Sequence, residues 1–364
     1  IRLLEQLREN TQLKTTIAII GAGPAGITLA LELEARGVDA ILLEGGGVEF
    51  DEDAQQRYAG ELDTTADLVY PPLDTWRLRM LGGTSNHWSG WCRRLESNVF
   101  EPRPWLGGIP WPFARQELEA GYRRAQQLCQ LGRDVYDPAE LQSDLGVTAW
   151  PELERYGLES SVWRYSPPTL FGERYRDDLE RSSIDVLLHA NVVGFEATTN
   201  AVSSVRVVGE DRLARTVSAE IVVIAAGGLE SVRQLLLFDA TGQISFNSSN
   251  WLGYGFMEHP HGAVGTIAID EDLATDPAGP LAPLRGRLSD IDGVDIRTGL
   301  TITPEACEHL GLPNMSFTID SLDGRADALT GLPFGTAISE LVPTVAGGRR
   351  AIPHQIYMRS EQRL

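Results

Sequence analysis

The amino-acid sequence predicts an α/β fold in which a parallel sheet comes first and an antiparallel sheet follows. Three observations lead to this prediction. Residues 15–44 follow the pattern of a strand, a glycine turn, a helix and a second strand. Residues 221–237 repeat the strand, the glycine turn and the helix. From residue 262 onward, short apolar segments alternate with loops rich in Asp, Gly and Pro, which is typical of antiparallel strands.

The first glycine turn directly follows a strand. Ile17–Ile20 is short, apolar and β-branched, as expected of a buried parallel strand. Gly21, Gly23 and Gly26 follow in the GxGxxG spacing. The first glycine permits a tight turn, the second lets the backbone approach a pyrophosphate, and the third lets the helix pack closely on the strand. An isolated GxGxxG could be an ordinary glycine turn, but its place between a strand and a helix predicts a dinucleotide site.

The helix and the second strand complete this motif. Apolar residues recur on one face of the predicted helix: Ala25, Leu29, Ala30 and Leu33. The second strand, Ala40–Leu43, ends at Glu44, whose carboxylate is placed to accept hydrogen bonds from a ribose diol. The motif alone does not distinguish NAD from FAD.

Composition limits the class of partner. The 364 residues are enough for two domains with substantial cores. The formal net charge of −20 argues against nucleic acid and anionic membrane as partners, because both would repel the chain. The apolar runs are too short to span a bilayer and no export signal opens the chain, so we expect a cytoplasmic location. The separated cysteines indicate neither a disulfide framework nor a zinc site: Cys92, Cys129 and Cys307.

A second concentration of small and hydrogen-bonding residues lies in the stretch RLRMLGGTSNHWSGWCRRL, residues 77–95. Its glycines permit close backbone approach, and its polar side chains offer several hydrogen-bonding groups. The alternative is a glycine turn beside a core tryptophan, with the histidine bonded to a backbone carbonyl. Its small and hydrogen-bonding residues include Gly82, Gly83, Thr84, His87, Trp88 and Ser89, and the family resemblance described below implies that they contact a cofactor.

The remaining segments are less specific. Residues 1–14 suggest a short polar helix or an ordered tail. Leu118, Tyr122, Ala125 and Cys129 predict an amphipathic helix packed through these residues. An antiparallel meander is expected from Val186–Phe195 onward, and further strands are expected at residues 264–269, 299–302, 314–319 and 356–358.

Two histidines near the middle of the chain have HxH spacing. His259 and His261 would share a face of a strand, but no third ligand has a convincing spacing. We therefore expect no metal site, and His259 is not a catalytic candidate.

Four segments together resemble the glucose-methanol-choline (GMC) oxidoreductases. They are GAGPAG with Glu44, LGGTSNHW, VVIAAGGLES and GFMEHP, in the order found in that family. The resemblance implies an FAD/NAD(P)-binding Rossmann-like domain with an antiparallel-sheet substrate domain. The expected FAD-binding domain is discontinuous, residues 1–107 and 184–260, with a helical cap insertion at 108–183. The substrate-binding sheet is expected at 261–364 and is expected to be incomplete at its C-terminus.

The resemblance also implies roles for individual residues. The GxGxxG turn would bind the ADP half of FAD, and the GG segment would lie along the pyrophosphate and isoalloxazine. GGTSNHW is especially similar to the pyranose oxidase branch, in which a histidine at the position of His87 carries the flavin covalently. Ser89 falls on a threonine that faces flavin and substrate. Val192 would contact the adenine through its backbone and Gly227 would approach the flavin, although both strands could serve the core alone.

The implied activity is oxidation of an alcohol group of a sugar, glycoside, aminosugar or other polyol by hydride transfer to flavin N5. Electrons would then pass to O2 or another acceptor. The family's catalytic histidine, with its His or Asn partner, is expected beyond Leu364, because no histidine follows His354. The alternatives are a redox-silent, lyase-type flavoprotein, a flavin subunit completed by a C-terminal fragment or partner chain, and a nicotinamide enzyme.

Overall fold

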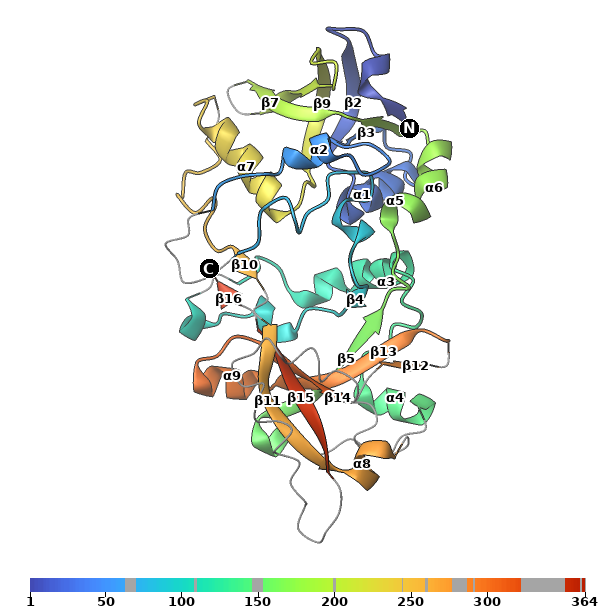
Figure 1. Cartoon of the computed structure of the whole chain (residues 1–364). Coiled ribbons are helices and arrows are strands. Elements are labelled where there is room, and N and C mark those ends of the chain that lie inside the picture. The colour runs from blue at the N-terminus through green and yellow to red at the C-terminus, as the bar shows by residue number, and fades with distance from the viewer. Residues whose placement is uncertain are drawn as a thin grey trace. The chain divides into compact units, whose positions relative to one another are not determined.

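A computed structural model describes residues 1–62, 70–107, 110–145, 153–198, 201–243, 245–258, 261–276, 287–290, 292–321, 351–360 and 362–363. The chain forms two units, each made from two separate stretches. The first unit contains Ile1–Trp88 and Thr169–Tyr254, and the second contains Ser89–Pro168 and Gly255–Leu364. Figure 1 labels most of their helices and strands.

These boundaries differ from the expected ones, which set residues 108–183 apart as a cap insertion. The main reason is strand β5, Leu158–Tyr165. It pairs antiparallel with β13, Asp295–Ile302, over the register from Leu158↔Ile302 to Arg164↔Ile296. Residues 89–168 therefore belong with the antiparallel sheet, and residues 169–183 belong with the first unit.

The first unit is built on a sheet with the strand order β1-β6-β3-β2-β9-β8-β7. The first five strands in this order run parallel, whereas β8 and β7 are antiparallel additions at one edge. The strand bounds are β1 Arg2–Leu3, β2 Gln12–Ile20, β3 Ala40–Leu43, β6 Asp185–Leu188, β7 Asn191–Ala197, β8 Val202–Val208 and β9 Ala214–Ile224. The expected strands at residues 17–20 and 40–43 are confirmed, and the strand expected at residues 221–225 is confirmed as far as Ile224, where β9 ends.

Helices connect and flank these strands. Their bounds are α1 Pro24–Glu34, α2 Glu52–Gln56, α5 Phe171–Arg174, α6 Arg176–Arg181 and α7 Gly228–Asp239. The two helices expected after the glycine turns are confirmed as α1 and α7. Apolar side chains from the strands and from Phe238 of α7 form one continuous core, which is why the strands read as uninterrupted hydrophobic runs.

Two expectations for this unit are corrected. Of the two alternatives for residues 1–14, the ordered tail agrees with the structure and the polar helix does not, because Leu4 is fully buried in the core and Arg2 pairs with Leu187 in the sheet. The stretch Val186–Phe195 is not one strand, because the backbone turns at His189, where φ is 56°. Its first half, β6, is therefore a parallel strand beside β3, and only its second half enters the antiparallel meander.

The second unit contains an antiparallel sheet with the order β11-β15-β14-β13-β5-β4, with β12 beside β13 and a separate β10–β16 pair. The remaining strand bounds are β4 Trp91–Cys92, β10 Met257–Glu258, β11 His261–Asp270, β12 Arg287–Ser289, β14 Met315–Ser321, β15 Ala351–Ser360 and β16 Gln362–Arg363. The four strands expected in the last third of the chain are confirmed within β11, β13, β14 and β15.

The helices of the second unit are α3 Glu119–Leu128, α4 Pro138–Leu145, α8 Glu271–Thr275 and α9 Pro304–Leu310. The amphipathic helix is confirmed as α3, but its expected inner face is partly wrong. Ala125 is exposed, whereas Gln126 is buried. Its carboxamide donates to Leu131 O at 3.1 Å and to Arg133 O at 2.9 Å, so the loop after the helix satisfies this buried polar side chain.

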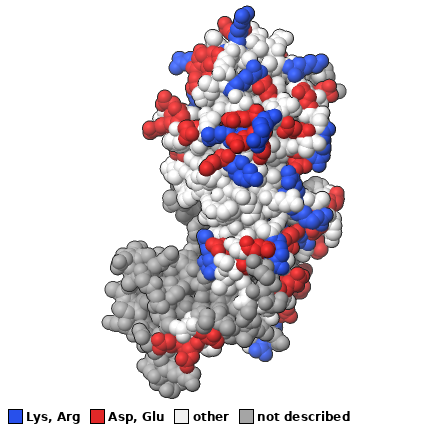
Figure 2. All heavy atoms as spheres, turned by 90° about the vertical axis from the view of Figure 1, so that its right-hand side faces the viewer, with Lys and Arg blue, Asp and Glu red and all other residues white. Residues whose placement is uncertain are grey.

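The acidic excess does not form a single patch on the face shown in Figure 2, where acidic and basic side chains are interspersed. Among the described helices, none is both long and apolar enough to cross a membrane.

Candidate functional site

The first glycine turn has the geometry that its sequence predicts. Gly21 follows β2 with φ 100°, and a Cβ there would lie 2.7 Å from Ala225 O. A Cβ at Gly26 would lie 1.9 Å from Gly21 O, so α1 packs on the turn at a distance that only glycine allows. At Gly23, by contrast, a Cβ would meet nothing within 4 Å. The backbone at Gly23 therefore faces open space, as a pyrophosphate site requires.

The start of helix α1 suits an anion. Gly23 is its N-cap and makes no side-chain capping bond, Pro24 follows, and the first turn carries no acidic residue. The amides of a first helical turn have no partner within the helix, and the helix dipole places partial positive charge there. This helix end therefore attracts a phosphate.

The second glycine turn lies beside the first. Strand β9 runs parallel to β2 with Ile224 opposite Ile20, and Ala225 N donates to Ile20 O at 2.7 Å. The next turn brings Gly227 to the N-cap of α7 with φ 79°, and a Cβ there would meet nothing within 4 Å. A second open helix start is thus held at the same end of the sheet.

The GG segment packs directly on the first turn. Gly82 N donates to Ala22 O at 2.8 Å, and a Cβ on Gly83 would lie 3.1 Å from Gly23 Cα. The first glycine turn is therefore contacted by two distant segments: Gly83 packs against Gly23, and Ala225 packs against Gly21. Of the residues expected at the cofactor, the structure brings together Gly21, Gly23, Gly26, Gly82 and Gly83, with Gly227 on the adjoining turn.

Glu44 is 6% exposed and lies next to this meeting point. One carboxylate oxygen accepts from Ala22 N at 2.9 Å and the other from Gly46 N at 2.8 Å. Burial raises the pKa of Glu44, while these two bonds and the charge of Arg79 oppose the rise. Because each carboxylate oxygen can accept more than one hydrogen bond, the group retains capacity for a ribose hydroxyl.

Arg79 is a site residue that the sequence did not reveal. Its Nη2 donates to Asn191 Oδ1 at 2.8 Å, and its guanidinium covers Gly45, where a Cβ would lie 2.2 Å from Nη2. The guanidinium also lies 5.2 Å from the ring centre of Tyr58. Its Nε is buried without a hydrogen-bond partner in the described part of the chain. The neighbours of Arg79 come from distant segments, so no local pattern could have indicated this cation.

The residues after the GG pair divide into exposed and anchored ones. Residues 83–86 form a 3-10 turn, and Thr84 Oγ1 accepts from Leu78 N at 3.4 Å. The side chains of Thr84, His87 and Ser89 are exposed. Trp88 is anchored instead: its Nε1 donates to Thr169 O at 3.0 Å. The interpretation of this tryptophan as a structural residue is therefore supported by its contacts.

Val192 lies in β7 opposite Val207, and its side chain packs against the core of the first unit. The residue before it, Asn191, holds Arg79. A backbone contact of Val192 with adenine stays a prediction.

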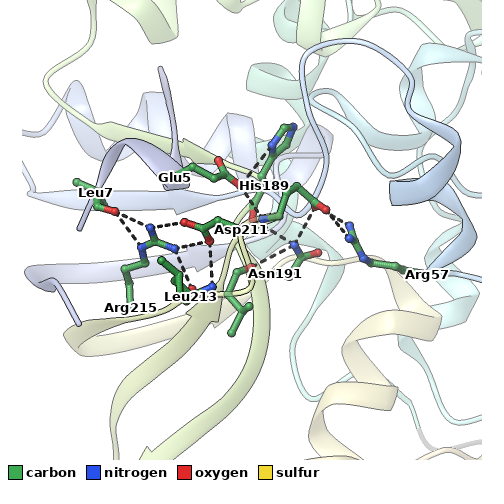
Figure 3. A network of polar contacts seen from close by, with 10 residues as sticks. Glu5, Leu7, Arg57, His189, Asn191, Asp211, Leu213 and Arg215 are labelled. Atoms are coloured by element: carbon green, nitrogen blue, oxygen red, sulfur yellow. Dashed lines mark hydrogen bonds and ion pairs between the residues drawn. The ribbon is translucent and has the colours of Figure 1, made fainter. Parts of the chain in front are cut away.

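A polar network holds the segment that follows β6 (Figure 3). His189 Nδ1 lies 3.6 Å from Glu5, and Arg57 makes a two-point ion pair with Glu210, at 2.7 and 2.6 Å. The Arg57 guanidinium is the largest cause of the lowered pKa of Glu210. This network supports the loop beside Glu44, because Ala190 N donates to Glu44 O at 2.7 Å.

The second part of the network fixes the start of the chain. The side chain of Arg215 is 1% exposed and donates to Asp211 Oδ2 and to Leu7 O (Figure 3). Arg215 lowers the pKa of Asp211 to about 2. The N-terminal segment is thereby tied to β9.

The second unit contains a cavity of about 520 Å³ on its sheet. Arg93 lies over the ring of Trp163 at 5.2 Å and pairs with Glu96 at 2.5 Å. Burial, and then the charge of Glu96, raise the pKa of Glu159, which accepts from Thr301 Oγ1 at 3.3 Å. Sequence analysis did not reveal this cavity, because its walls come from separate strands. Its lining includes Trp91, Arg93, Glu159, Trp163, Thr301 and Asn314.

His259 lies outside the described residues, so the expectation for it has no structural outcome.

Comparison with known proteins gives one family match. The model of the family described as FAD dependent oxidoreductase matches residues 16–245. A search of curated proteins found no match. The open turn at Gly23, the uncapped start of α1 and the buried Glu44 fit the ADP portion of FAD. The choice between NAD and FAD, which the glycine motif left open, is therefore FAD.

Solved structures similar to the chain include pyridoxine 4-oxidase from Mesorbium loti, with a TM-score of 0.47 and 15% identity over 95% of this chain and 71% of that one. Formate oxidase from Aspergillus oryzae has a TM-score of 0.45 and 12% identity over 97% and 73%. A fungal aryl-alcohol oxidase has a TM-score of 0.43 and 16% identity over 73% and 54%. These likenesses are too distant to carry a functional argument.

Proposed function

The chain belongs to the FAD dependent oxidoreductase family, and we propose that it oxidises an alcohol group of a small molecule. When bound, FAD supplies a two-electron acceptor that amino-acid side chains do not provide. One observation carries the proposal: the GG segment and the second glycine turn both pack on the first glycine turn, Gly21–Gly23, in a chain whose family uses FAD.

The chain's own residues would hold the cofactor in the following way. The backbone at Gly23 and the first turn of α1 would bind the pyrophosphate, and Glu44 would accept hydrogen bonds from the ribose. Arg79 is a cation beside Glu44, and its charge opposes the rise in the pKa of Glu44 that burial causes.

We propose a sugar, glycoside, aminosugar or other polyol as the substrate, oxidised in the manner of the GMC oxidoreductases. The order of the segments LGGTSNHW, VVIAAGGLES and GFMEHP supports this substrate class. The cavity of the second unit supports it as well. Its two tryptophans can stack on an apolar sugar face, while Glu159, Thr301 and Asn314 can hydrogen-bond to hydroxyl groups.

Two spectroscopic measurements test this function. The purified protein should show a flavin absorbance spectrum, and a colourless preparation that takes up no FAD would refute the cofactor assignment. Under anaerobic conditions, one or more members of a panel of sugars and alcohols should bleach the flavin. If dithionite bleaches it and no alcohol does, the redox-silent, lyase-type alternative is favoured. Intact mass and gel filtration of the natural protein would reveal a partner chain.

We also propose that His87 carries the flavin covalently, since its side chain is exposed on the segment that packs on the first glycine turn. Acid precipitation should leave yellow colour in the protein pellet. His87→Ala should move that colour to the supernatant. Colour that stays in the supernatant of the unmodified protein would refute the covalent bond.

A further inference from the structure

The cavity of the second unit is lined by one charged side chain that has no ion-pair partner among the described residues. The charged residues of its lining are Arg93, Arg94, Glu96 and Glu159. Arg93 pairs with Glu96 at 2.5 Å. Arg94 forms ion pairs with two carboxylates that do not line the cavity. Glu159 forms no ion pair in the described part of the chain, so the unmatched charge at the cavity wall is negative.

The antiparallel sheet holds Glu159 in position at this wall. Glu159 of β5 lies opposite Thr301 of β13, whose hydroxyl donates to Glu159 Oε1 at 3.3 Å. The other carboxylate oxygen, Oε2, accepts no hydrogen bond from the described residues. A carboxylate can accept several hydrogen bonds, so Glu159 retains an oxygen for a donor that enters the cavity.

An aromatic ring of the lining lies on the same face of the sheet as Glu159. Trp163 follows Glu159 by four residues in β5, and alternate side chains of a strand share a face. A Cβ at Gly299 would lie 2.6 Å from the Trp163 ring, so the ring reaches the level of Gly299 and of Ser161 opposite it. That level is two residues along the strand, or about 7 Å, from Glu159. A single sugar ring with an amino substituent can therefore extend from the tryptophan to the carboxylate.

The charges around Glu159 favour a positively charged ligand. Burial is the largest cause of the raised pKa of Glu159, and the charges of Glu96 and Glu305 raise this pKa as well. The charge of Arg93 opposes them, but Arg93 is already paired with Glu96. An ammonium group beside Glu159 would reduce the repulsion between these carboxylates, whereas a ligand carboxylate would increase it.

We propose that this cavity binds a sugar or another polyol that carries a protonated amino group, and that Glu159 receives this group. Among the substrate classes of the proposed function, the unmatched negative charge selects the aminosugar. The inference rests on the proposed function only in treating this ligand as the substrate. The binding itself does not require a flavin reaction, so it can be measured separately.

Calorimetric titration of the flavin-loaded protein tests the charge preference. The flavin is reduced beforehand, so that no oxidation accompanies binding. The probes are glucosamine, glucose and glucuronate, which carry a positive charge, no charge and a negative charge on similar rings. Glucosamine should bind about tenfold or more tightly than glucose, because its bond to the carboxylate is charge-assisted, and glucuronate should bind more weakly than glucose. The proposal is overturned if glucosamine binds no more tightly than glucose, if glucuronate is preferred, or if glucosamine shows no saturable binding.

Two substitutions assign the preference to a residue. Glu159→Gln keeps the length of the side chain and removes its charge, so this variant should bind glucosamine and glucose with similar affinity. Glu154→Gln is the matched control, because Glu154 is exposed ahead of β5 and does not line the cavity; this variant should keep the preference for glucosamine. A preference that survives Glu159→Gln would contradict the role of Glu159. The three probes on the unmodified protein decide the charge preference, whatever the stability of the variants.

Flavin bleaching under anaerobic conditions separates this inference from the proposed function. If glucosamine binds through Glu159 and no alcohol bleaches the flavin, the ligand preference stands and the proposed oxidation fails. If other alcohols bleach the flavin but glucosamine neither binds nor bleaches it, the proposed oxidation stands and this inference fails.

Discussion

Alanine substitutions at two glycines of the same turn should separate protein stability from cofactor binding. Gly26→Ala should lower the stability, whereas Gly23→Ala should weaken FAD binding and leave the stability nearly unchanged. A Cβ at Gly26 would lie 1.9 Å from the carbonyl oxygen of Gly21, so α1 must move away from the turn. Overpacking of this kind costs about 1–3 kcal/mol or more, and the upper end applies because the obstacle is backbone. The helix propensity of alanine returns about 1 kcal/mol. We therefore expect Gly26→Ala to lower the free energy of unfolding by about 2 kcal/mol.

At Gly23 the balance is different, because a Cβ meets nothing within 4 Å and φ is −78°. Restricting the unfolded chain gains about 0.4–1 kcal/mol, and alanine is a poorer N-cap than glycine by a similar amount. Gly23→Ala should therefore leave the stability of the FAD-free protein nearly unchanged. Its methyl group would project into the space expected for the pyrophosphate and should weaken FAD binding about tenfold or more.

Urea unfolding of the FAD-free proteins measures the change in the free energy of unfolding. Flavin fluorescence during titration with FAD measures the change in FAD affinity. Gly121→Ala is the matched control, because Gly121 lies within α3 where a Cβ meets nothing within 4 Å. It should gain up to about 1 kcal/mol and bind FAD normally. The reasoning fails if Gly23→Ala unfolds as readily as Gly26→Ala, or if it binds FAD as tightly as the unmodified protein.

Two further substitutions, Asp211→Asn and Glu44→Gln, test the charged groups, and Glu32→Gln is the control for the first. Asp211→Asn should lower the free energy of unfolding in urea by about 1–3 kcal/mol, because Arg215 is buried and loses its carboxylate partner. Glu32→Gln removes the carboxylate of the exposed pair with Arg36 and serves as the control. It should lower the free energy of unfolding by less than about 0.5 kcal/mol. Since the pKa of Asp211 is lowered from 3.8 to about 2, its stabilising effect should be complete above pH 3.8 and be lost as pH falls towards 2, and Asp211→Asn should lack this acid dependence. Glu44→Gln should weaken FAD binding by about 10- to 100-fold, from the loss of charge-assisted bonds to the ribose, and unchanged affinity would refute that role.

The sequence predicted those parts of the site whose requirements are local. Gly21 and Gly26 are needed because the turn and the helix approach one another within a few residues, so their spacing reveals them. The strand ending at Glu44 is equally local. Gly82 and Gly83 were predicted to lie at the cofactor beside the first glycine turn. Their packing on that turn agrees with this prediction.

The features that sequence analysis missed depend on long-range contacts. Leu4 is buried by strands that follow much later, so a short segment that reads as polar joins the core. Arg79 gains its position from Asn191, which lies more than a hundred residues later in the chain. The break at His189 depends on a positive φ in a residue other than glycine, which composition does not indicate.

The pairing of β2 with β9 also has a consequence for synthesis of the chain. This pairing joins Gln12 to Thr216 and Ile20 to Ile224, so an inner edge of the first unit's sheet stays open until the ribosome has made most of the first unit and the first stretch of the second, Ser89–Pro168. Parallel contacts of such long range form slowly, and an open apolar strand edge invites pairing between molecules. The nascent chain is therefore most prone to aggregate before residue 224 emerges, and chaperone capacity, rather than the stability of the finished fold, is expected to limit the yield of the protein.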